Sequence, residues 1–367
     1  IDVINMSVGE PDFMTPDHVK EAGKKAIDDN FSKYSPVPGY PVLREAIVKK
    51  LKQENHLDYA VSEIVVGTGG KQGVCNAILA LVNPGDEVII PAPYWVSYPQ
   101  MVKLAGGVPV IVSAGIEQDF KITAEQLEHA ITRKTKMIIL CSPSNPTGSV
   151  YSAEELESLA KVVLAHDDLF VLSDEIYEHI NYIGGHCSIA SCQGMKDRTI
   201  LCNGVSKAYA MTGWRLGWIA APEWIAKGIN KLQGQYTSGT CSVSQMAAVA
   251  AYEADQACVA DYREAFRRRR DLIVRLAKEI PGLEVNVPQG AFYLFPKCSS
   301  YFGKTDGKHV IRSSSDLAMY ILEEGGVATV GGDAFGAPEC FRMSYATSDD
   351  NIKEALHRIK EVLSKLK

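Results

Sequence analysis

The sequence lacks a long uncharged hydrophobic run, a paired-cysteine motif and an excess of positive charge. No stretch of about 18 apolar residues without a charge occurs in the 367 residues, so we expect no membrane-spanning helix. The nine cysteines form neither a Cys-x-x-Cys pair nor a cluster with histidine. That usage argues against disulfides and against a metal site, and it favours a reducing, cytoplasmic location. The net charge of −6 argues against a nucleic-acid or membrane-surface partner.

One local run of positive charge, Arg267–Arg270, departs from this acidic balance. Acidic neighbours flank the run at Glu264 and Asp271. We interpret the four arginines as a solvent-exposed helix face and not as an anion-binding patch.

Short apolar runs alternate with helical stretches from about residue 64 to 240, as in "DEVIIPA", "KMIILCSPS" and "TILCNG". Continuous runs of this kind predict parallel strands that are buried on both faces, with helices on each side. After about residue 250 a long helix, two strand-like pieces and two amphipathic helices predict a smaller α+β domain. We therefore predict an α/β fold with a large domain over 17–265, and a small domain formed by 1–16 and 266–367.

Lys207 and Arg215 lie in "GVSKAYAMTGWRLG", residues 204–217, among small and apolar neighbours. Lys207 follows a predicted parallel strand, at the edge of the sheet where such folds bind ligands. Apolar neighbours would desolvate its ammonium and lower its pKa, as a Schiff-base or general-base lysine requires. A surface lysine, and an arginine stacked on tryptophan, are the alternative interpretations.

Three polar loops follow other predicted strands. "GTGGKQG", residues 67–73, closes a strand and opens a helix whose N-terminus would favour an anion, although a plain tight turn has the same pattern. Asn145 lies in the turn "SPSNPTG". Asp174 and Tyr177, in "VLSDEIY", could hold a heteroaromatic ring, or Asp174 could cap the next helix.

Two further signals complete the set. Trp95 follows the strand "EVIIPA" and suits either packing or ring stacking. Arg342 lies inside the apolar stretch "CFRMSYA", where a buried arginine needs a partner such as a substrate carboxylate. An anion-binding turn, an aromatic plate, an amide, an acid–phenol pair, a desolvated lysine and two arginines together suit pyridoxal 5'-phosphate.

These motifs resemble those of the class I aminotransferases of the fold-type I pyridoxal-phosphate superfamily over essentially the whole chain. "GVSKAYAMTGWRLG" is similar to the lysine-attachment signature of that family, and "NPTG", "DEIY" and "FRMSYA" follow its order. "GEPDFMTP", "KYSPVPGYPVLREA", "GGKQ" and "YWVSYP" resemble the bacterial and plastid-type aspartate aminotransferases more closely.

The resemblance implies a role for each residue on the cofactor. Lys207 would form the Schiff base and, once displaced, move the proton between substrate Cα and the cofactor. Asp174 would keep the pyridine nitrogen protonated, Tyr177 and Asn145 would hydrogen-bond the ring oxygen, and Trp95 would stack on the ring.

Separate sets of residues would bind the phosphate and the substrate. The backbone of Gly70 and Lys71, with Arg215, would hold the phosphate. Tyr34 would reach the phosphate of a neighbouring subunit, which implies a homodimer with shared active sites. Arg342 and the backbone of Gly9 would bind the α-carboxylate, with Trp95 and Asn145 also in contact with the substrate.

Amino acids and 2-oxo acids are the substrates that the resemblance implies, with aspartate and 2-oxoglutarate favoured because Lys71 would meet a distal carboxylate. Lys71 could instead contribute only its backbone N–H. The chain begins at Ile1 without methionine, so we expect a preceding segment to supply further contacts. Prephenate transamination, alone or as a second activity, is the nearest alternative. An alternative from another class is a ligand-sensing regulator that uses the same fold.

Overall fold

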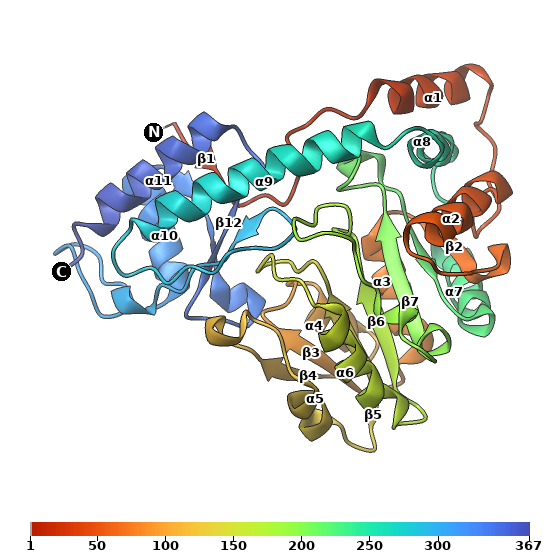
Figure 1. The fold of residues 1–367 in the computed structure, drawn as a ribbon, viewed down its shortest axis with the longest axis horizontal. Coiled ribbons are helices and arrows are strands. Elements are labelled where there is room, and N and C mark those ends of the chain that lie inside the picture. The colour runs from red at the N-terminus through yellow and green to blue at the C-terminus, as the bar shows by residue number, and fades with distance from the viewer. Residues whose placement is uncertain (1) are drawn as a thin grey trace.

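The computed structural model describes residues 2–367, and its chain forms two parts that lie side by side (Figure 1). The larger part contains a seven-stranded sheet, and the smaller part contains a three-stranded and a two-stranded sheet. The chain begins in the smaller part at β1 (Ile4–Asn5) and crosses to the larger part before α1 (Asp17–Asp28).

The seven-stranded sheet has the order β2-β8-β7-β6-β5-β3-β4. All its strands run parallel except β8, which is antiparallel to both of its neighbours. The strands are β2 (Ile64–Gly67), β3 (Glu87–Ala92), β4 (Val108–Ser113), β5 (Thr135–Cys141), β6 (Phe170–Asp174), β7 (Thr199–Gly204) and β8 (Gly217–Ala220). Every residue of β2, β6 and β7 is buried, which confirms the prediction from their continuous apolar runs. The residues of β8 are also buried, but this antiparallel strand was not predicted from the sequence.

Helices cover both faces of this sheet because alternate strand residues point to opposite sides. Val88 and Ile90 of β3 pack in the core that includes α3, α4 and α7, whereas Ile89 packs in the core that includes α5 and α6. A third core joins β2, β7 and β8 to α1, α2 and α8. These helices are α2 (Pro41–Glu54), α3 (Gly70–Leu81), α4 (Tyr98–Leu104), α5 (Ala124–Ala130), α6 (Ala153–Leu164), α7 (Glu223–Tyr236) and α8 (Ser242–Glu253).

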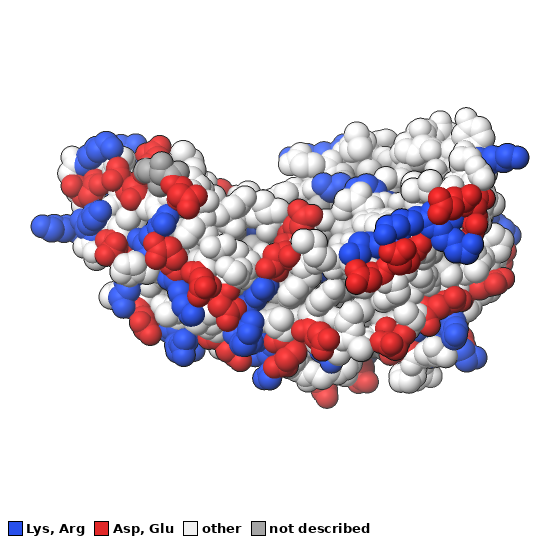
Figure 2. Space-filling view, turned by 90° about the horizontal axis from the view of Figure 1, so that it is seen from above, with Lys and Arg blue, Asp and Glu red and all other residues white. Residues whose placement is uncertain are grey.

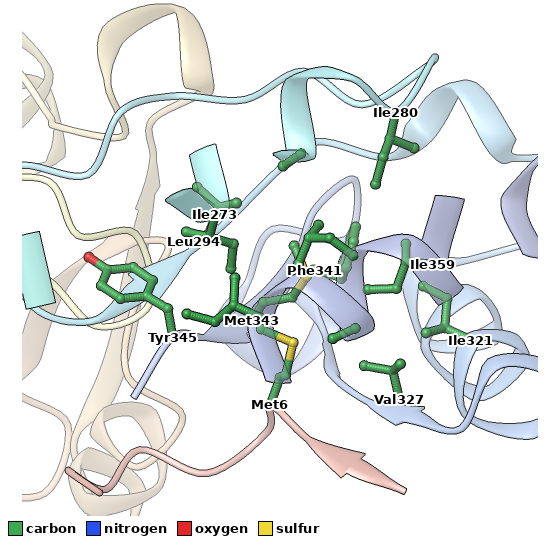
Figure 3. Packing of buried hydrophobic residues seen from close by; sticks show 14 of the residues in the cluster. Met6, Ile273, Ile280, Leu294, Ile321, Val327, Phe341, Met343, Tyr345 and Ile359 are labelled. Atoms are coloured by element: carbon green, nitrogen blue, oxygen red, sulfur yellow. The ribbon is translucent and has the colours of Figure 1, made fainter. Parts of the chain in front are cut away.

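Met6, Leu294, Phe341 and Ile359 contribute to the main hydrophobic core of the smaller part (Figure 3). Its sheets pair β1 with β10 in parallel, and β12 with β9 and β11 in antiparallel. The elements are β9 (Tyr293–Leu294), β10 (Val327–Ala328), β11 (Val330–Gly331), β12 (Phe341–Ser344), α10 (Ser314–Gly325) and α11 (Asp349–Leu363). The mixture of short strands and helices is the α+β arrangement expected from the sequence.

Helix α9 (Ala257–Lys278) runs along both parts of the chain (Figure 1). The expected domain boundary at residue 265 falls within this helix, so the division into 17–265 and 1–16 with 266–367 stays a prediction. Short 3-10 turns complete the secondary structure: η1 (Val61–Glu63), η2 (Ile116–Gln118), η3 (Ile189–Ser191), η4 (Lys196–Arg198), η5 (Thr212–Trp214), η6 (Ser299–Tyr301) and η7 (Gly332–Phe335).

The arginine run on α9 corrects one expectation from the sequence. Arg267 and Arg268 are exposed, as predicted, but Arg269 is buried and donates two hydrogen bonds to Asp12, at 2.7 and 3.0 Å. The prediction of a solvent-exposed face was wrong for Arg269 and also for Arg270, whose side chain is only 12% exposed and donates to the carbonyl of Pro288. Asp12 is 257 residues from Arg269 in the chain, so its approach leaves no local pattern. The bidentate ion pair of Arg269 with Asp12 connects the N-terminal segment to α9.

The surface agrees with the modest net charge of the chain. Positive and negative side chains are interspersed over the face shown in Figure 2. Within residues 2–367, no helix is long and apolar enough to cross a membrane.

Candidate active site

A cavity of about 340 Å³ lies where the loops after β2, β3, β5, β6 and β7 meet residues of the smaller part. Its size is in the range of small-molecule sites. Ten of the eleven residues predicted from the sequence line it: Gly9, Gly70, Lys71, Trp95, Asn145, Asp174, Tyr177, Lys207, Arg215 and Arg342. The sequence patterns thus predicted a single site from segments far apart in the chain.

Lys207 follows β7, in a turn whose neighbours Ser206 and Ala208 are buried. Burial, aided by the charges of Arg215 and Arg342 and opposed by those of Glu10 and Asp174, lowers the pKa of Lys207 to about 8. Its Nζ donates a hydrogen bond of 2.6 Å to the carbonyl of Gly9. A lysine with this pKa has a substantial neutral fraction near pH 8, which a nucleophile or base requires.

Asp174 is the last residue of β6 and is buried. Burial raises the pKa of its carboxyl to about 6, although hydrogen bonds from the Tyr98 hydroxyl and the Ile176 N–H oppose the shift. The Tyr98 bond measures 2.7 Å and the Ile176 bond 3.3 Å. These donors orient the carboxylate toward the cavity, where it could pair with a protonated ring nitrogen.

The N-terminus of α3 forms an anion cradle with Arg215. Gly69 precedes the helix with φ +79°, and a Cβ there would lie 2.6 Å from Nη2 of Arg215. A Cβ on Gly217 would lie 2.2 Å from the backbone nitrogen of Gly70. Glycine at both positions therefore lets the helix N-terminus and the guanidinium approach the same space. Arg215 itself is in the left-handed region and donates to the carbonyl of Thr212 at 2.8 Å.

Arg342 extends from β12 into the cavity and is buried. It donates to Oδ1 of Asn145 at 2.9 Å and to the carbonyl of Ser7 at 2.6 Å. The rings of Tyr293 and Phe335 lie 4.6 and 4.8 Å from its guanidinium. Its Nε is buried and has no partner in the part of the chain described. A guanidinium held in this way, with its Nε–H available as a further donor, suits a carboxylate ligand.

Trp95 and Lys71 lie together on another wall of the cavity. The Nζ of Lys71 is 4.8 Å from the centre of the Trp95 ring, a cation–π distance. Trp95 packs edge-to-face on Tyr98, with ring centres 5.3 Å apart. The side chain of Lys71 thus reaches along the aromatic wall and is available to a second acidic group.

Tyr34 is the predicted residue that the structure does not bring to this cavity. Its side chain is almost fully exposed, at 99%. Sequence reasoning also missed several lining residues, above all Tyr98 and Tyr293. Tyr98 stands three residues after Trp95 in "YWVSYP", so helical spacing could have indicated it; nothing in "GAFYLFP" indicates that Tyr293 meets Tyr177.

The donor set fits pyridoxal 5'-phosphate on the geometry of this chain. The space that a Cβ at Gly69 would fill, beside Arg215, suits a phosphate; the Trp95 ring suits stacking on an aromatic ring, and Lys207 supplies a desolvated amine. Asp174 provides the buried acid that a pyridine nitrogen needs.

Comparisons with known proteins agree with this site. The family model "Aminotransferase class I and II" matches residues 1–359. The chain is 50% identical to the aspartate/prephenate aminotransferase of Cereibacter sphaeroides, over 98% of this chain and 90% of that protein. It is 49% identical to a bifunctional aspartate aminotransferase and glutamate/aspartate-prephenate aminotransferase of Petunia hybrida, over 100% of this chain and 78% of that protein.

Solved structures give the same result. The aspartate aminotransferase of Rhizobium meliloti is similar with a TM-score of 0.97 and 45% identity, covering 100% of this chain and 92% of that one. The Thermus thermophilus aspartate aminotransferase with maleate has a TM-score of 0.93 and 41% identity, covering 99% and 92%. The chain belongs to the class I and II aminotransferases. It is a fold-type I enzyme that depends on pyridoxal 5'-phosphate, as predicted.

Proposed function

We propose that the enzyme transfers the amino group of aspartate to 2-oxoglutarate, producing oxaloacetate and glutamate. The observation that carries this proposal is that Lys71 and Arg342 line the same cavity, in addition to the cofactor-binding cations Lys207 and Arg215. Two cations beyond those that the cofactor needs suit a substrate with two carboxylates. The Thermus relative, solved with the dicarboxylate maleate, supports this substrate class.

Bound pyridoxal phosphate supplies an electron-accepting ring and a carbonyl carbon that carries the amino group between the two substrates. In the proposed mechanism Asp174 holds a proton at the ring nitrogen, and Tyr177 and Asn145 donate hydrogen bonds to the ring oxygen. The Arg215 guanidinium and the backbone N–H groups of Gly70 and Lys71 hold the phosphate.

The remaining residues act on the substrate. Arg342 binds the α-carboxylate with its fork, and the backbone of Gly9 lies beside it. This orientation fixes the Cα–H bond near Nζ of Lys207, which accepts the proton as a base and later returns it. A pKa near 8 suits both directions of that transfer.

The experiment that tests the proposal measures kcat/KM of the holoenzyme for a panel of amino donors with 2-oxoglutarate. Aspartate and glutamate should exceed alanine and phenylalanine. Lys207→Ala should abolish both amino-group transfer and the near-ultraviolet to visible absorbance of the covalently bound cofactor. Near wild-type turnover of that variant would disprove the role of Lys207.

Prephenate is the second candidate substrate, because the Cereibacter and Petunia relatives carry it in their names. Prephenate also has a second carboxylate, so the Lys71 and Arg342 pair suits it. Adding prephenate as the amino acceptor to the same panel distinguishes one activity from two.

We also propose a homodimer whose partner completes the phosphate site. Two exposed residues support it, Tyr34 and Met14, together with an open groove beside Arg215 that Glu10 and Thr240 help to line. Tyr34→Phe should weaken cofactor binding in the dimer, with equilibrium dialysis as the measurement and sedimentation as the check on assembly. An unchanged affinity would remove Tyr34 from the site.

The nine free cysteines support a reducing compartment, and we propose the cytoplasm. Thiol titration of the freshly isolated, denatured protein should find all nine reduced. Oxidised pairs would contradict this location.

A further inference from the structure

The turn that carries Asp174 and Tyr177 has no helix or strand of its own after β6 ends. Within the turn the N–H of Glu178 donates to the carbonyl of Glu175 at 2.9 Å and the N–H of Ile180 to that of Tyr177 at 2.8 Å, and the turn is joined to β7 by the N–H of Glu175, which donates to the carbonyl of Cys202 at 2.9 Å. A turn of this kind needs side-chain contacts to hold two cavity residues in place.

The side chains of the turn divide between two sides. Asp174 and Tyr177 line the cavity. Glu175 and Glu178, each one residue further on, are buried and make their contacts with other segments of the larger part. Glu175 and Glu178 therefore point away from the cavity and into the protein.

Glu178 is held by α2 and the residue that follows it. Lys50 of α2 forms an ion pair with Oε1 of Glu178, and Nδ2 of Asn55 donates to Oε2 at 3.0 Å. Lys50 also donates to Oδ1 of Asn55 at 2.7 Å, which closes a ring of three hydrogen-bonded side chains. His179 adds a contact of 3.4 Å to the same carboxylate.

Glu175 is held by one residue of the adjoining strand β6 and by two residues that follow the turn. The hydroxyls of Ser173 and Ser188 donate to its Oε1 at 2.8 and 2.6 Å, and Nε2 of His186 lies 2.7 Å from its Oε2. The His186 side chain is itself only 8% exposed. The carboxylates of Glu175 and Glu178 thus each have several buried hydrogen-bond partners.

Opposite charges lie next to each other in this cluster. Burial disfavours the charged form of Glu178, but Lys50 and the two histidines outweigh it and hold the pKa of Glu178 below its usual range. Burial likewise opposes a charge on His186, but Glu175 outweighs it and raises the pKa of His186. Glu175 therefore pairs with His186 and Glu178 with Lys50, while Glu54 lies 3.6 Å from the Lys50 ammonium and 2.9 Å from His179.

We propose that Lys50, Glu175, Glu178 and His186 form a positioning network that fixes Asp174 and Tyr177 from behind. The inference rests on the proposed roles of Asp174 and Tyr177 toward the cofactor. The network residues touch neither the cavity nor the reacting atoms, so they are positioning residues. Because small displacements of catalytic groups are costly, loss of the network should change how the cofactor is held.

The test uses Glu178→Gln, which keeps the shape of the side chain and removes its charge. The matched control is Ile47→Ala, which opens a cavity on the same helix as Lys50 but leaves the network intact. For each variant we would measure the melting temperature, the dissociation constant for pyridoxal phosphate, and the pH midpoint of the cofactor's near-visible absorbance.

Glu178→Gln should weaken cofactor binding about tenfold and move the absorbance midpoint by about half a pH unit or more. Ile47→Ala should lower only the melting temperature. If Glu178→Gln behaves like Ile47→Ala in all three measurements, the network is merely structural and the proposal is overturned.

Two further variants keep the result decisive. Should Glu178→Gln not fold, His186→Gln removes the opposite charge of the network with retention of a donor, and the same outcomes apply. Asp174→Asn separates this proposal from the site assignment. A change with Asp174→Asn but none with the network variants overturns the network alone, whereas no change with Asp174→Asn overturns the assignment on which it rests.

Discussion

The hydroxyl groups of Tyr177 and Tyr293 lie 2.7 Å apart and form a hydrogen bond across the cavity. Tyr177 belongs to the turn after β6 in the larger part, whereas Tyr293 begins β9 in the smaller part. The ring of Tyr293 also lies 4.6 Å from the guanidinium of Arg342. One side chain thus connects the predicted ring-oxygen donor to the predicted carboxylate-binding arginine.

Tyr293→Phe removes the hydroxyl and keeps the ring. Loss of this buried hydrogen bond should weaken the affinity for the cofactor by about 1 kcal/mol, which is about fivefold. KM for aspartate should change less, because the ring still packs on Arg342. Cofactor titration and steady-state kinetics measure the two effects, and a large KM change with normal cofactor affinity would contradict this division.

Arg342→Lys keeps the positive charge and loses the fork. Because a lysine cannot replace two parallel N–H donors, kcat/KM for every amino acid substrate should fall by about 2 kcal/mol or more, roughly 30-fold. The loss should be equal for aspartate and alanine, since both carry the α-carboxylate. An unchanged kcat/KM would remove Arg342 from the substrate site.

Lys71→Met keeps the length of the stem over Trp95 and removes the ammonium. If Lys71 meets the distal carboxylate, kcat/KM for aspartate and glutamate should fall roughly 10- to 100-fold, the effect of one hydrogen bond to a charged group. Alanine and phenylalanine should lose little. Equal losses for all four donors would assign Lys71 to the phosphate instead.

The amine of Lys207 should set a pH dependence for cofactor capture by the apoprotein. Burial lowers its pKa to about 8, so the group is mostly ammonium below that pH and mostly free amine above it. Only the free amine attacks a carbonyl, and the second-order rate of capture should therefore rise with pH and level off above about 8. Stopped-flow absorbance measures the rate, and a midpoint above pH 10 would show that the amine is not desolvated.

The sequence predicted the large sheet and the strand-end loops well, because those features have local causes. The run "TILCNG" is apolar along its whole length since β7 is buried on both faces, and Lys207 then had to lie at the sheet edge. Likewise, "GTGGKQG" closes β2 and opens α3, as its glycines indicate.

The features that sequence reasoning missed depend on contacts between distant segments. Arg269 is buried because Asp12 reaches α9, and Tyr293 belongs to the site because the smaller part places it against Tyr177. Neither contact leaves a period or a motif in its own segment. From the other wall, the sequence indicated only Arg342, because an arginine inside an apolar strand is a local signal, and Gly9 by resemblance; Tyr293 has no such signal.

The hydrogen bonds of Ser7 and Gly9 have a consequence for ligand choice. Their carbonyls accept from Arg342 and Lys207, each at 2.6 Å, so the N-terminal segment already engages both cations. An acid that binds Arg342 must displace the Ser7 carbonyl. A carboxylate can do so, because its full charge binds a cation more strongly than a carbonyl dipole does. An uncharged amine gains nothing there that offsets the lost bond, so this contact favours acidic ligands.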